Sequence, residues 1–205
     1  MAAGLTDDGG VRASGTFRRV RSRDLVHIAL FAAITAVLGL VPAVDVGPVP
    51  ITAQTLGVML AGSVLGARRG FLSQMLFLVL VAVGLPLLPG GRGGLSVFTG
   101  PTAGYLLSWP IAALVIGLIT ELVWRRYNLG WGVLANVVGG IVLIYAIGIP
   151  VSAAVLGTSP VAAATGALIF VPGDLVKAVV AAAVAVQVRR SYPVIEPRDR
   201  AVAPR

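Results

Sequence analysis

The fold is decided first by residues 25–44, LVHIALFAAITAVLGLVPAV, an apolar run without Asp, Glu, Lys or Arg. As an α-helix this run is about 30 Å long, which matches the hydrocarbon thickness of a bilayer. Arginines precede it, as in a signal peptide, but it lacks a small-residue cleavage site in a polar context. We therefore predict a retained membrane span over Leu25–Val44.

The composition extends this interpretation to the whole chain. Of the 205 residues, 57% are apolar and 12% are charged, whereas a soluble domain carries about 25% charged residues. That supply of charge is too small to cover a water-facing surface. We predict an all-α membrane protein with six transmembrane helices in one membrane domain, residues 24–190. The further predicted spans are Thr52–Ala67, Phe71–Leu88, Thr102–Trp124, Leu129–Leu156 and Gly173–Val188.

Arginines set the predicted orientation. They lie before the first span, after the last span, and at the junctions 68–69 and 125–126. With six spans all these positions fall on one side of the membrane, and cytoplasmic segments are the ones that collect Lys and Arg. The loops on the opposite side contain one basic residue, Arg92, and we predict them to be structured outer loops. They are residues 45–51, 89–101 and 157–171. The apolar segment Thr158–Val171 is bounded by prolines, so it is either a short outer helix or the start of the last span.

The net charge of +8 follows this membrane pattern, so we expect no nucleic-acid partner. Contact with anionic membrane lipids is a secondary consequence of the same arginines. Residues 1–23 are polar and are predicted to form a disordered N-terminal tail. Residues 191–205 are predicted to form a C-terminal tail. We expect a multi-pass protein of the plasma membrane with both termini in the cytoplasm.

The chain has no Cys and a single histidine, His27. No disulfide, zinc–thiolate site or cysteine nucleophile is therefore available, and multi-histidine metal sites are excluded. No GxxxxGK[ST] motif occurs, so the chain cannot hydrolyse ATP through a P-loop by itself. We predict a protein that is not an enzyme and has no catalytic residues, metal or cofactor.

Asp174 and Lys177 are two charges within the last apolar run. Each costs roughly 2.5–3.5 kcal/mol near the centre of a membrane helix, and at i, i+3 spacing they share one helix face. An internal ion pair would explain them, as would helix capping by Asp174. Because Pro172 favours a helix start, both charges would lie close to the outer loops. There we predict a site for a polar ligand.

The segments expected near this pair have unusual compositions. Residues 46–54, VGPVPITAQ, contain two prolines, and residues 89–104, PGGRGGLSVFTGPTAG, are rich in glycine, which permits close backbone approach to a ligand. We predict structured loops over a site and not flexible connectors. Tyr105 is either a wall of the site or part of an interfacial aromatic belt. Trp109 is more typical of core packing, and Gln54 either points into the site or caps the second span.

Other polar and small residues favour structural roles. Glu121 with Arg125 is typical of a surface ion pair, and Gln74 and Asn136 are typical of interhelical hydrogen bonds. The first span also has alanines at two i, i+4 spacings, a pattern that lets another helix, internal or from a partner, pack closely. These alanines are Ala29 with Ala33, and Ala32 with Ala36.

Three stretches together resemble the BioY family, the biotin-capturing S components of energy-coupling factor (ECF) transporters. They are Pro48–Gly66 (PVPITAQTLGVMLAGSVLG), Gly90–Trp109 (GGRGGLSVFTGPTAGYLLSW) and Val171–Ala178 (VPGDLVKA). The resemblance runs from about Asp24 to Val188. The chain departs from the family at Ala103, where a glycine is usual, and at Ser108-Trp109, where Gly-Phe is usual.

The resemblance implies an S component that captures biotin at the outer face. It further implies that the alanine pattern of the first span docks onto a transmembrane T component, which couples to two cytosolic ATPase subunits. The implied mechanism is capture outside, toppling of the S component in the membrane, and release inside. The implied ligand contacts are Asp174, Lys177, Tyr105, Arg92, Gly91 and Gln54.

Two alternatives stay open. One is an ion-coupled secondary transporter of a small carboxylate, with Asp174 as the coupling site. The other is an S component for a different vitamin. An intramembrane enzyme is disfavoured by the single histidine and by the missing second carboxylate near Asp174.

Overall fold

The computed structural model of the protein describes residues 22–43, 49–192 and 194–195. These residues fold into helices and turns, with an isolated antiparallel bridge between Leu88 and Arg92. The α-helices are α1 (Ser22–Leu38), α2 (Gln54–Leu65), α3 (Ala67–Ala82), α4 (Ala103–Leu122), α5 (Leu129–Val137), α6 (Ile144–Leu156), α7 (Pro160–Ala167) and α8 (Val171–Ser191).

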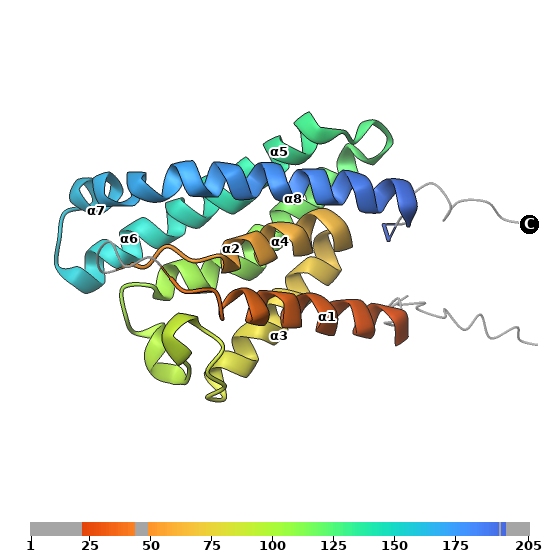
Figure 1. The fold of residues 1–205 in the computed structure, drawn as a ribbon. Coiled ribbons are helices and arrows are strands. Elements are labelled where there is room, and N and C mark those ends of the chain that lie inside the picture. The colour runs from red at the N-terminus through yellow and green to blue at the C-terminus, as the bar shows by residue number, and fades with distance from the viewer. Residues whose placement is uncertain (1–21, 44–48, 193, 196–205) are drawn as a thin grey trace, which may run out of the picture.

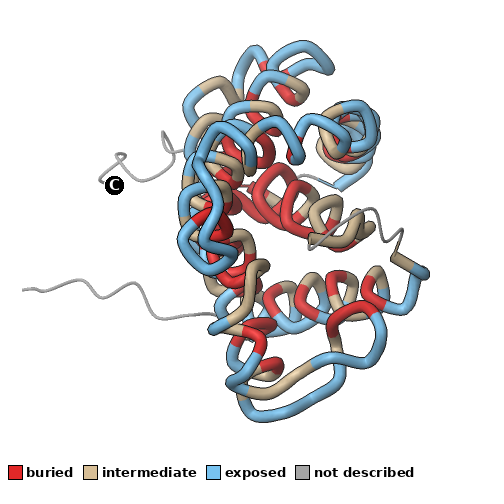
Figure 2. Tube along the Cα trace, turned by 90° about the vertical axis from the view of Figure 1, so that its left-hand side faces the viewer, coloured by how far each residue is buried: buried red, intermediate tan, exposed pale blue. Residues whose placement is uncertain are grey.

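The helices form one bundle whose first and last helices have their free ends together. Figure 1 shows the start of α1 and the end of α8 at one end of the bundle, with the α6–α7 connection at the other. Helix α4 packs against α2, α3 and α6, and α8 packs against α2 and α5. Buried residues lie toward the middle of the bundle, and exposed ones lie outside (Figure 2).

Three helical stretches are long and apolar enough to cross a membrane, and α2 is a shorter apolar helix. The outward faces of the bundle are themselves apolar, with Leu30 and Val37 of α1 and Val176 of α8 more than half exposed. Such a surface suits a hydrocarbon solvent and not water. The three long stretches among the described residues are Ala103–Leu122, Leu129–Leu156 and Pro160–Ser191.

The predicted span Leu129–Leu156 is one continuous helical stretch with these same bounds. Its middle is a π-helical turn, Val138–Leu143, between α5 and α6. Gly139 and Gly140 lie in this turn, where a Cβ atom would stand 2.5 Å from Ile116 and 2.6 Å from Met59. The glycines therefore let α4 and α2 approach this stretch closely.

The predicted junction at Arg68 and Arg69 is wrong in one respect, because both residues lie in the first turn of α3 and not in a loop. Gly66 alone links α2 to α3, with φ of 82°, a left-handed conformation that glycine adopts without strain. The Oε1 atom of Glu121 accepts the backbone N–H of Ala67 at 2.8 Å. This bond satisfies one of the free N–H groups at the start of α3.

The first predicted span also ends early, since α1 stops at Leu38. Gly39 follows, and a Cβ atom there would overlap the Leu87 carbonyl and stand 2.7 Å from the Gln54 amide nitrogen. Only glycine, which has no Cβ atom, fits at position 39. The rest of the predicted span, up to Val44, is not helical where the structure describes it.

The segment 157–171 is not an open loop, because α7 and a 3-10 turn fill most of it and lead directly into α8. Of the two alternatives for Thr158–Val171, the short outer helix is the one found. Ser159 caps α7 by accepting the Ala162 N–H at 3.2 Å, and Pro160 occupies the first turn. These are ordinary helix-start signals. Helix α8 begins at Val171, one residue before the predicted Pro172.

Arg69 links several segments at the side of the bundle where α1 begins and α8 ends. Its guanidinium donates to Asp24 of α1 at 3.2 Å, to the Leu65 carbonyl of α2 at 3.0 Å and to the Val194 carbonyl at 2.9 Å. Ile195 of the predicted C-terminal tail is buried, so this residue packs on the bundle. Residues 1–21 and 196–205 of the two predicted tails lie outside the described residues.

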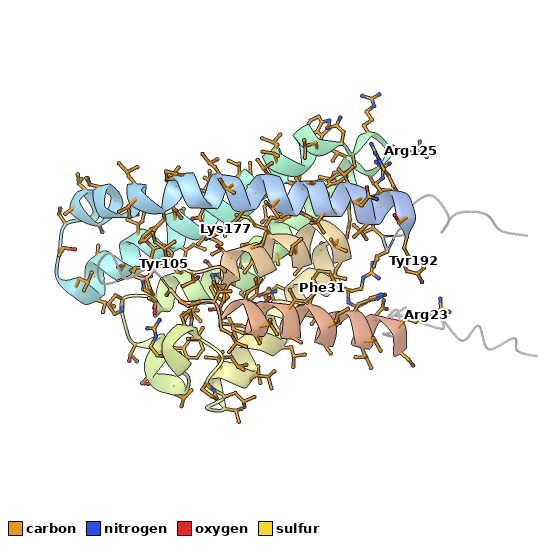
Figure 3. All side chains as sticks on the ribbon, in the orientation of Figure 1. Arg23, Phe31, Tyr105, Arg125, Lys177 and Tyr192 are labelled. Atoms are coloured by element: carbon orange, nitrogen blue, oxygen red, sulfur yellow. The ribbon has the colours of Figure 1, made fainter. Side chains whose placement is uncertain are left out.

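Basic residues mark this same end of the molecule. Figure 3 places Arg23, Arg125 and Tyr192 there, while Tyr105 and Lys177 lie in the other half. Arg189 donates to the Tyr127 carbonyl, and its guanidinium lies over the Trp124 ring at 5.0 Å from the centroid. The predicted interhelical bonds are confirmed as well. Gln74 donates to Thr35 at 3.2 Å, and Asn136 accepts from Ser63 at 2.9 Å.

We expect Glu121→Ala to destabilise the bundle by about 1 kcal/mol, because the N–H of Ala67 loses its acceptor. The midpoint of thermal unfolding in detergent should fall by roughly 2–4 °C. Glu121→Gln keeps a carbonyl oxygen at this place and should recover most of the loss. Equal midpoints for the alanine variant and the unmodified protein would contradict the capping role.

Candidate ligand pocket

Asp174 and Lys177 form a buried ion pair in α8. The Lys177 Nζ atom lies 2.8 Å from Asp174 Oδ1, and their side chains are 16% and 6% exposed. The predicted internal ion pair is therefore confirmed. The capping alternative is wrong, because α8 begins at Val171 and no side chain caps it.

The ion pair also forms hydrogen bonds with residues from two other helices and one loop. Tyr145 of α6 donates to Asp174 Oδ2 at 2.6 Å, and Thr55 of α2 donates to Oδ1 at 3.3 Å. Lys177 donates to the Thr52 carbonyl at 2.6 Å and to the Thr55 hydroxyl at 3.0 Å. All three N–H donors of the ammonium are thus used. We call these five residues the Asp174 network.

A pocket that is partly open to the outside lies against this network. Its walls are mostly apolar with a few polar groups, as is typical of small-molecule sites. Aromatic side chains from α4, α6 and the turn before α8 supply much of its lining: Tyr105, Trp109, Tyr145 and Phe170. Pro50 and Ile51 line it from the segment before α2, and Pro89 and Arg92 line it from the glycine-rich loop.

The structure brings five of the predicted site residues to this pocket: Asp174, Lys177, Tyr105, Arg92 and Gln54. The sixth, Gly91, is not on the pocket wall. It follows Gly90 in a 3-10 turn and has φ of 72°, so its role is to let the backbone turn before Arg92. Arg92 is exposed, and its Nε donates to the Pro89 carbonyl at 3.2 Å.

The glycine-rich loop is structured, as predicted. It contains the 3-10 turns Pro89–Gly91 and Leu95–Phe98. The Gly94 N–H donates to the Val81 carbonyl of α3 at 2.7 Å, and Val97 is buried in the core. These contacts anchor the second half of the loop, directly after Arg92.

Gln54 is fully buried and lines the pocket from the first turn of α2. Its Nε2 donates to the Thr35 carbonyl of α1 at 3.1 Å and to the Leu87 carbonyl at 3.0 Å. Two carbonyl acceptors at one end fix the amide's orientation. The Oε1 atom has no partner among the described residues. Gln54 therefore joins the end of α1 to the pocket and does not cap its own helix.

Tyr105 stands in the wall and not on the lipid-facing side. It meets the Tyr145 ring edge-on, with centroids 6.3 Å apart. A Cβ atom at Gly148 would overlap the Tyr105 ring, so this glycine of α6 is what lets the ring lie against the helix. Figure 3 shows Tyr105 and Lys177 in the same half of the bundle.

Sequence reasoning missed Tyr145, Thr55 and Phe170. Tyr145 carries a hydroxyl within a long apolar stretch, and that isolated polar group was the available signal. Thr55 directly follows Gln54, a predicted site residue, and this position next to Gln54 was the available signal. Phe170 lies in the segment before the last helix, where no site residue was predicted. Among the described residues, no group of three His, Cys, Asp or Glu side chains could hold a metal ion.

The alanines of α1 divide between two faces. Ala29 and Ala33 are exposed. Ala32 is buried in the core, and Ala36 packs against the same cluster. The second pair is thus an internal helix contact, while the first pair is available at the surface.

Comparison with known proteins agrees with this architecture. The model of the BioY family matches residues 12–194. A biotin transporter BioY of Rhizobium etli is 49% identical over 187 residues, covering 86% of this chain and 98% of the relative. A probable biotin transporter BioY of Bacillus subtilis is 48% identical over 170 residues, covering 82% of this chain and 91% of the relative.

A solved structure is also similar. It is the crystal structure of the S-component for biotin from an ECF-type ABC transporter, with a TM-score of 0.79 and 29% identity over 82% of this chain and 91% of that one. The class is therefore that of membrane transport proteins with the S-component fold. The chain belongs to the BioY family.

We expect Lys177→Met to destabilise the protein by about 3–5 kcal/mol, because it leaves Asp174 buried without a cation. The double variant Asp174→Asn/Lys177→Met removes both charges and should be more stable than the single variant. Thermal unfolding in detergent measures both. If the single and double variants unfold at the same temperature, the stability lost in the single variant does not come from the unpaired charge of Asp174.

Proposed function

We propose that this protein is the S component of an ECF-type biotin importer. The pocket captures biotin at the outer face, and a transmembrane T component with two cytosolic ATPase subunits drives its delivery to the cytoplasm. The observation that carries the proposal is the pocket itself, in which a neutralised ion pair and four aromatic rings meet in a chain of the BioY family. Its relatives are named biotin transporters.

The chemistry of biotin suits these walls. Its fused ring system presents apolar faces that aromatic side chains can cover. Its ureido group offers N–H donors and a carbonyl acceptor, and its valerate chain ends in a carboxylate. Arg92 is the exposed cation at the pocket and is the natural partner of that carboxylate. Asp174, Lys177, Tyr105 and Gln54 are the other proposed contacts.

The proposed membrane arrangement has six spans with both termini in the cytoplasm. Its support is the shared end of the bundle where α1 begins, α8 ends and Arg125 lies (Figure 3). Clusters of arginine favour the cytoplasmic side. The glycine-rich loop and the pocket then face outward. Anionic lipids at the cytoplasmic surface would contact the arginine-rich end.

The proposed docking surface for the T component is the exposed face of α1 around Ala29 and Ala33. Small side chains there let another helix approach closely, and larger apolar ones, Leu25, Leu30 and Val37, flank them. Ala32 and Ala36 are not part of this surface, because they pack inward. Toppling of the docked protein in the membrane would carry the filled pocket toward the cytoplasm.

Purified protein should bind biotin in calorimetry, and Asp174→Ala and Lys177→Ala should each weaken binding by at least about 100-fold, since each leaves a buried charge unpaired. Arg190→Ala is the matched control, because it removes an exposed charge at the far end of the same helix. Tyr145→Phe keeps the ion pair and tests the network if the alanine variants do not fold. Undiminished binding in both alanine variants would refute the site.

Ala29→Trp should abolish co-purification with a co-expressed T component and its ATPases while leaving biotin binding intact. The bulky ring would hold the partner helix away from α1. Ala183→Trp is the control, because Ala183 is an exposed alanine on α8, and it should leave co-purification unchanged. Persisting co-purification of the Ala29 variant would rule out this docking face.

A further inference from the structure

Helix α1 is attached to the rest of the bundle along one narrow stripe. It packs on α2 and α3 (Figure 1), and the buried residues among its 17 are Ile28, Ala32 and Thr35. Ala32 and Thr35 bury little apolar surface, so apolar packing is a modest restraint on the orientation of this helix. Polar contacts near its two ends add to that restraint.

The contact near the end of α1 is made by Thr35, which is fully buried. Its hydroxyl accepts from Gln74 Nε2 of α3 at 3.2 Å, and its carbonyl accepts from Gln54 Nε2 of α2 at 3.1 Å. The main chain and the side chain of one residue are thus bonded to two neighbouring helices. This contact fixes α1 at a single point.

The contact at the start of α1 is the ion pair of Asp24 with Arg69 of α3, whose side chains are 29% and 21% exposed. The other guanidinium nitrogens of Arg69 donate to the carbonyls of Leu65 in α2 and Val194 after α8. Three nitrogens in a rigid fork therefore bind three segments, which the single nitrogen of a lysine could not do. Neither Arg69 nor Asp24 is among the residues that line the pocket.

The two contacts lie on the same side of α1. Asp24 and Thr35 are eleven residues apart, which is about 16 Å along the helix axis and about 20° around it. Ala29 and Ala33 lie between them in sequence, roughly 140–180° away around the axis, and both are exposed. A helix held at two points on one face cannot roll or swing away from the bundle. Its opposite face, with Ala29 and Ala33, therefore keeps one direction.

We propose that Arg69 is a positioning residue for docking of the T component. It holds the first turn of α1 on α3, so that the face with Ala29 and Ala33 is presented in one orientation. The inference rests on the proposed function and on the docking face proposed for α1. Without Arg69 the helix is attached at Thr35 and pivots about that point. Only a fraction of the molecules then presents the face correctly, and the affinity for the partner falls by that fraction.

The first experiment separates docking from biotin capture. Purified chain is mixed in detergent with a purified, tagged complex of the T component and its two ATPases, and the retained chain is measured. Calorimetry measures biotin binding. Arg69→Met should reduce the retained chain roughly three- to tenfold and leave the biotin dissociation constant unchanged, because Arg69 is not in the pocket wall.

Two further variants accompany Arg69→Met. Arg69→Lys keeps the charge but offers one nitrogen, so it should recover only part of the loss. Arg126→Met is the matched control, because it removes an exposed arginine from the turn after α4, next to Arg125 at the same end of the bundle (Figure 3). It should leave both measurements unchanged. Full retention of Arg69→Met, or equal losses in Arg69→Met and Arg126→Met, would overturn the proposal.

A cross-link distinguishes positioning of α1 from direct contact between Arg69 and the partner. The chain has no cysteine, so Asp24→Cys/Arg69→Cys contains two thiols and no others. The untreated double variant should be retained as poorly as Arg69→Met. After the thiols are bridged with a bifunctional methanethiosulfonate reagent, retention should return, and a reductant should abolish it again. A bridged protein that binds biotin normally but is still not retained would contradict positioning.

The double-cysteine variant also keeps the proposal testable if Arg69→Met does not fold, because the bridged and reduced forms are the same chain. Failure of the unmodified protein to be retained by the T component would overturn the proposed function, and the inference with it. Retention of the unmodified protein and of the reduced double variant in equal amounts would overturn the role of Arg69 alone. The two failures are thus distinguishable.

Discussion

The buried ion pair between Asp174 and Lys177 is the constraint on which the arrangement of the helices around the pocket depends. Either charge alone would be costly inside an apolar helix. Mutual attraction repays that cost only when further hydrogen bonds satisfy both groups. Those bonds come from Thr55 and the Thr52 carbonyl at the start of α2 and from Tyr145 on α6. Satisfying two charges on α8 therefore fixes the positions of two other helices, and the pocket lies where they meet.

Helix α2 is the shortest of the helices around the pocket's polar groups, yet two polar clusters meet at its first turn. Gln54 faces α1 and bonds the carbonyls of Thr35 and Leu87, while the next residue, Thr55, faces α8. Thr35 also binds Gln74 of α3. Consecutive residues of a helix point about 100° apart, so a Gln-Thr pair can reach two neighbours at once. The polar start of α2 thus connects the first, third and last helices in an otherwise apolar core.

The sequence predicted the helical runs and the acid–base pair, because charge within an apolar segment is a signal that needs no knowledge of packing. It could not place Tyr145, since the π-helical turn at 138–143 rotates every residue after it relative to a regular α-helix. Nor could it tell that Ala32 is buried while Ala29 is exposed, because the face of α1 that turns inward depends on where α2 and α3 pack. The sequence left residues 158–171 open between a short outer helix and the start of the last span, because Pro160 and Pro172 both suit the first turn of a helix.

The polar network beside the pocket resists change. Breaking into the Asp174 network would leave a charge unpaired in a low dielectric, which is costly. Tyr145 of α6 and Thr55 of α2 are therefore held in place by their hydrogen bonds to Asp174. The paired charges on α8 thus fix the spacing of the pocket walls that these two helices provide.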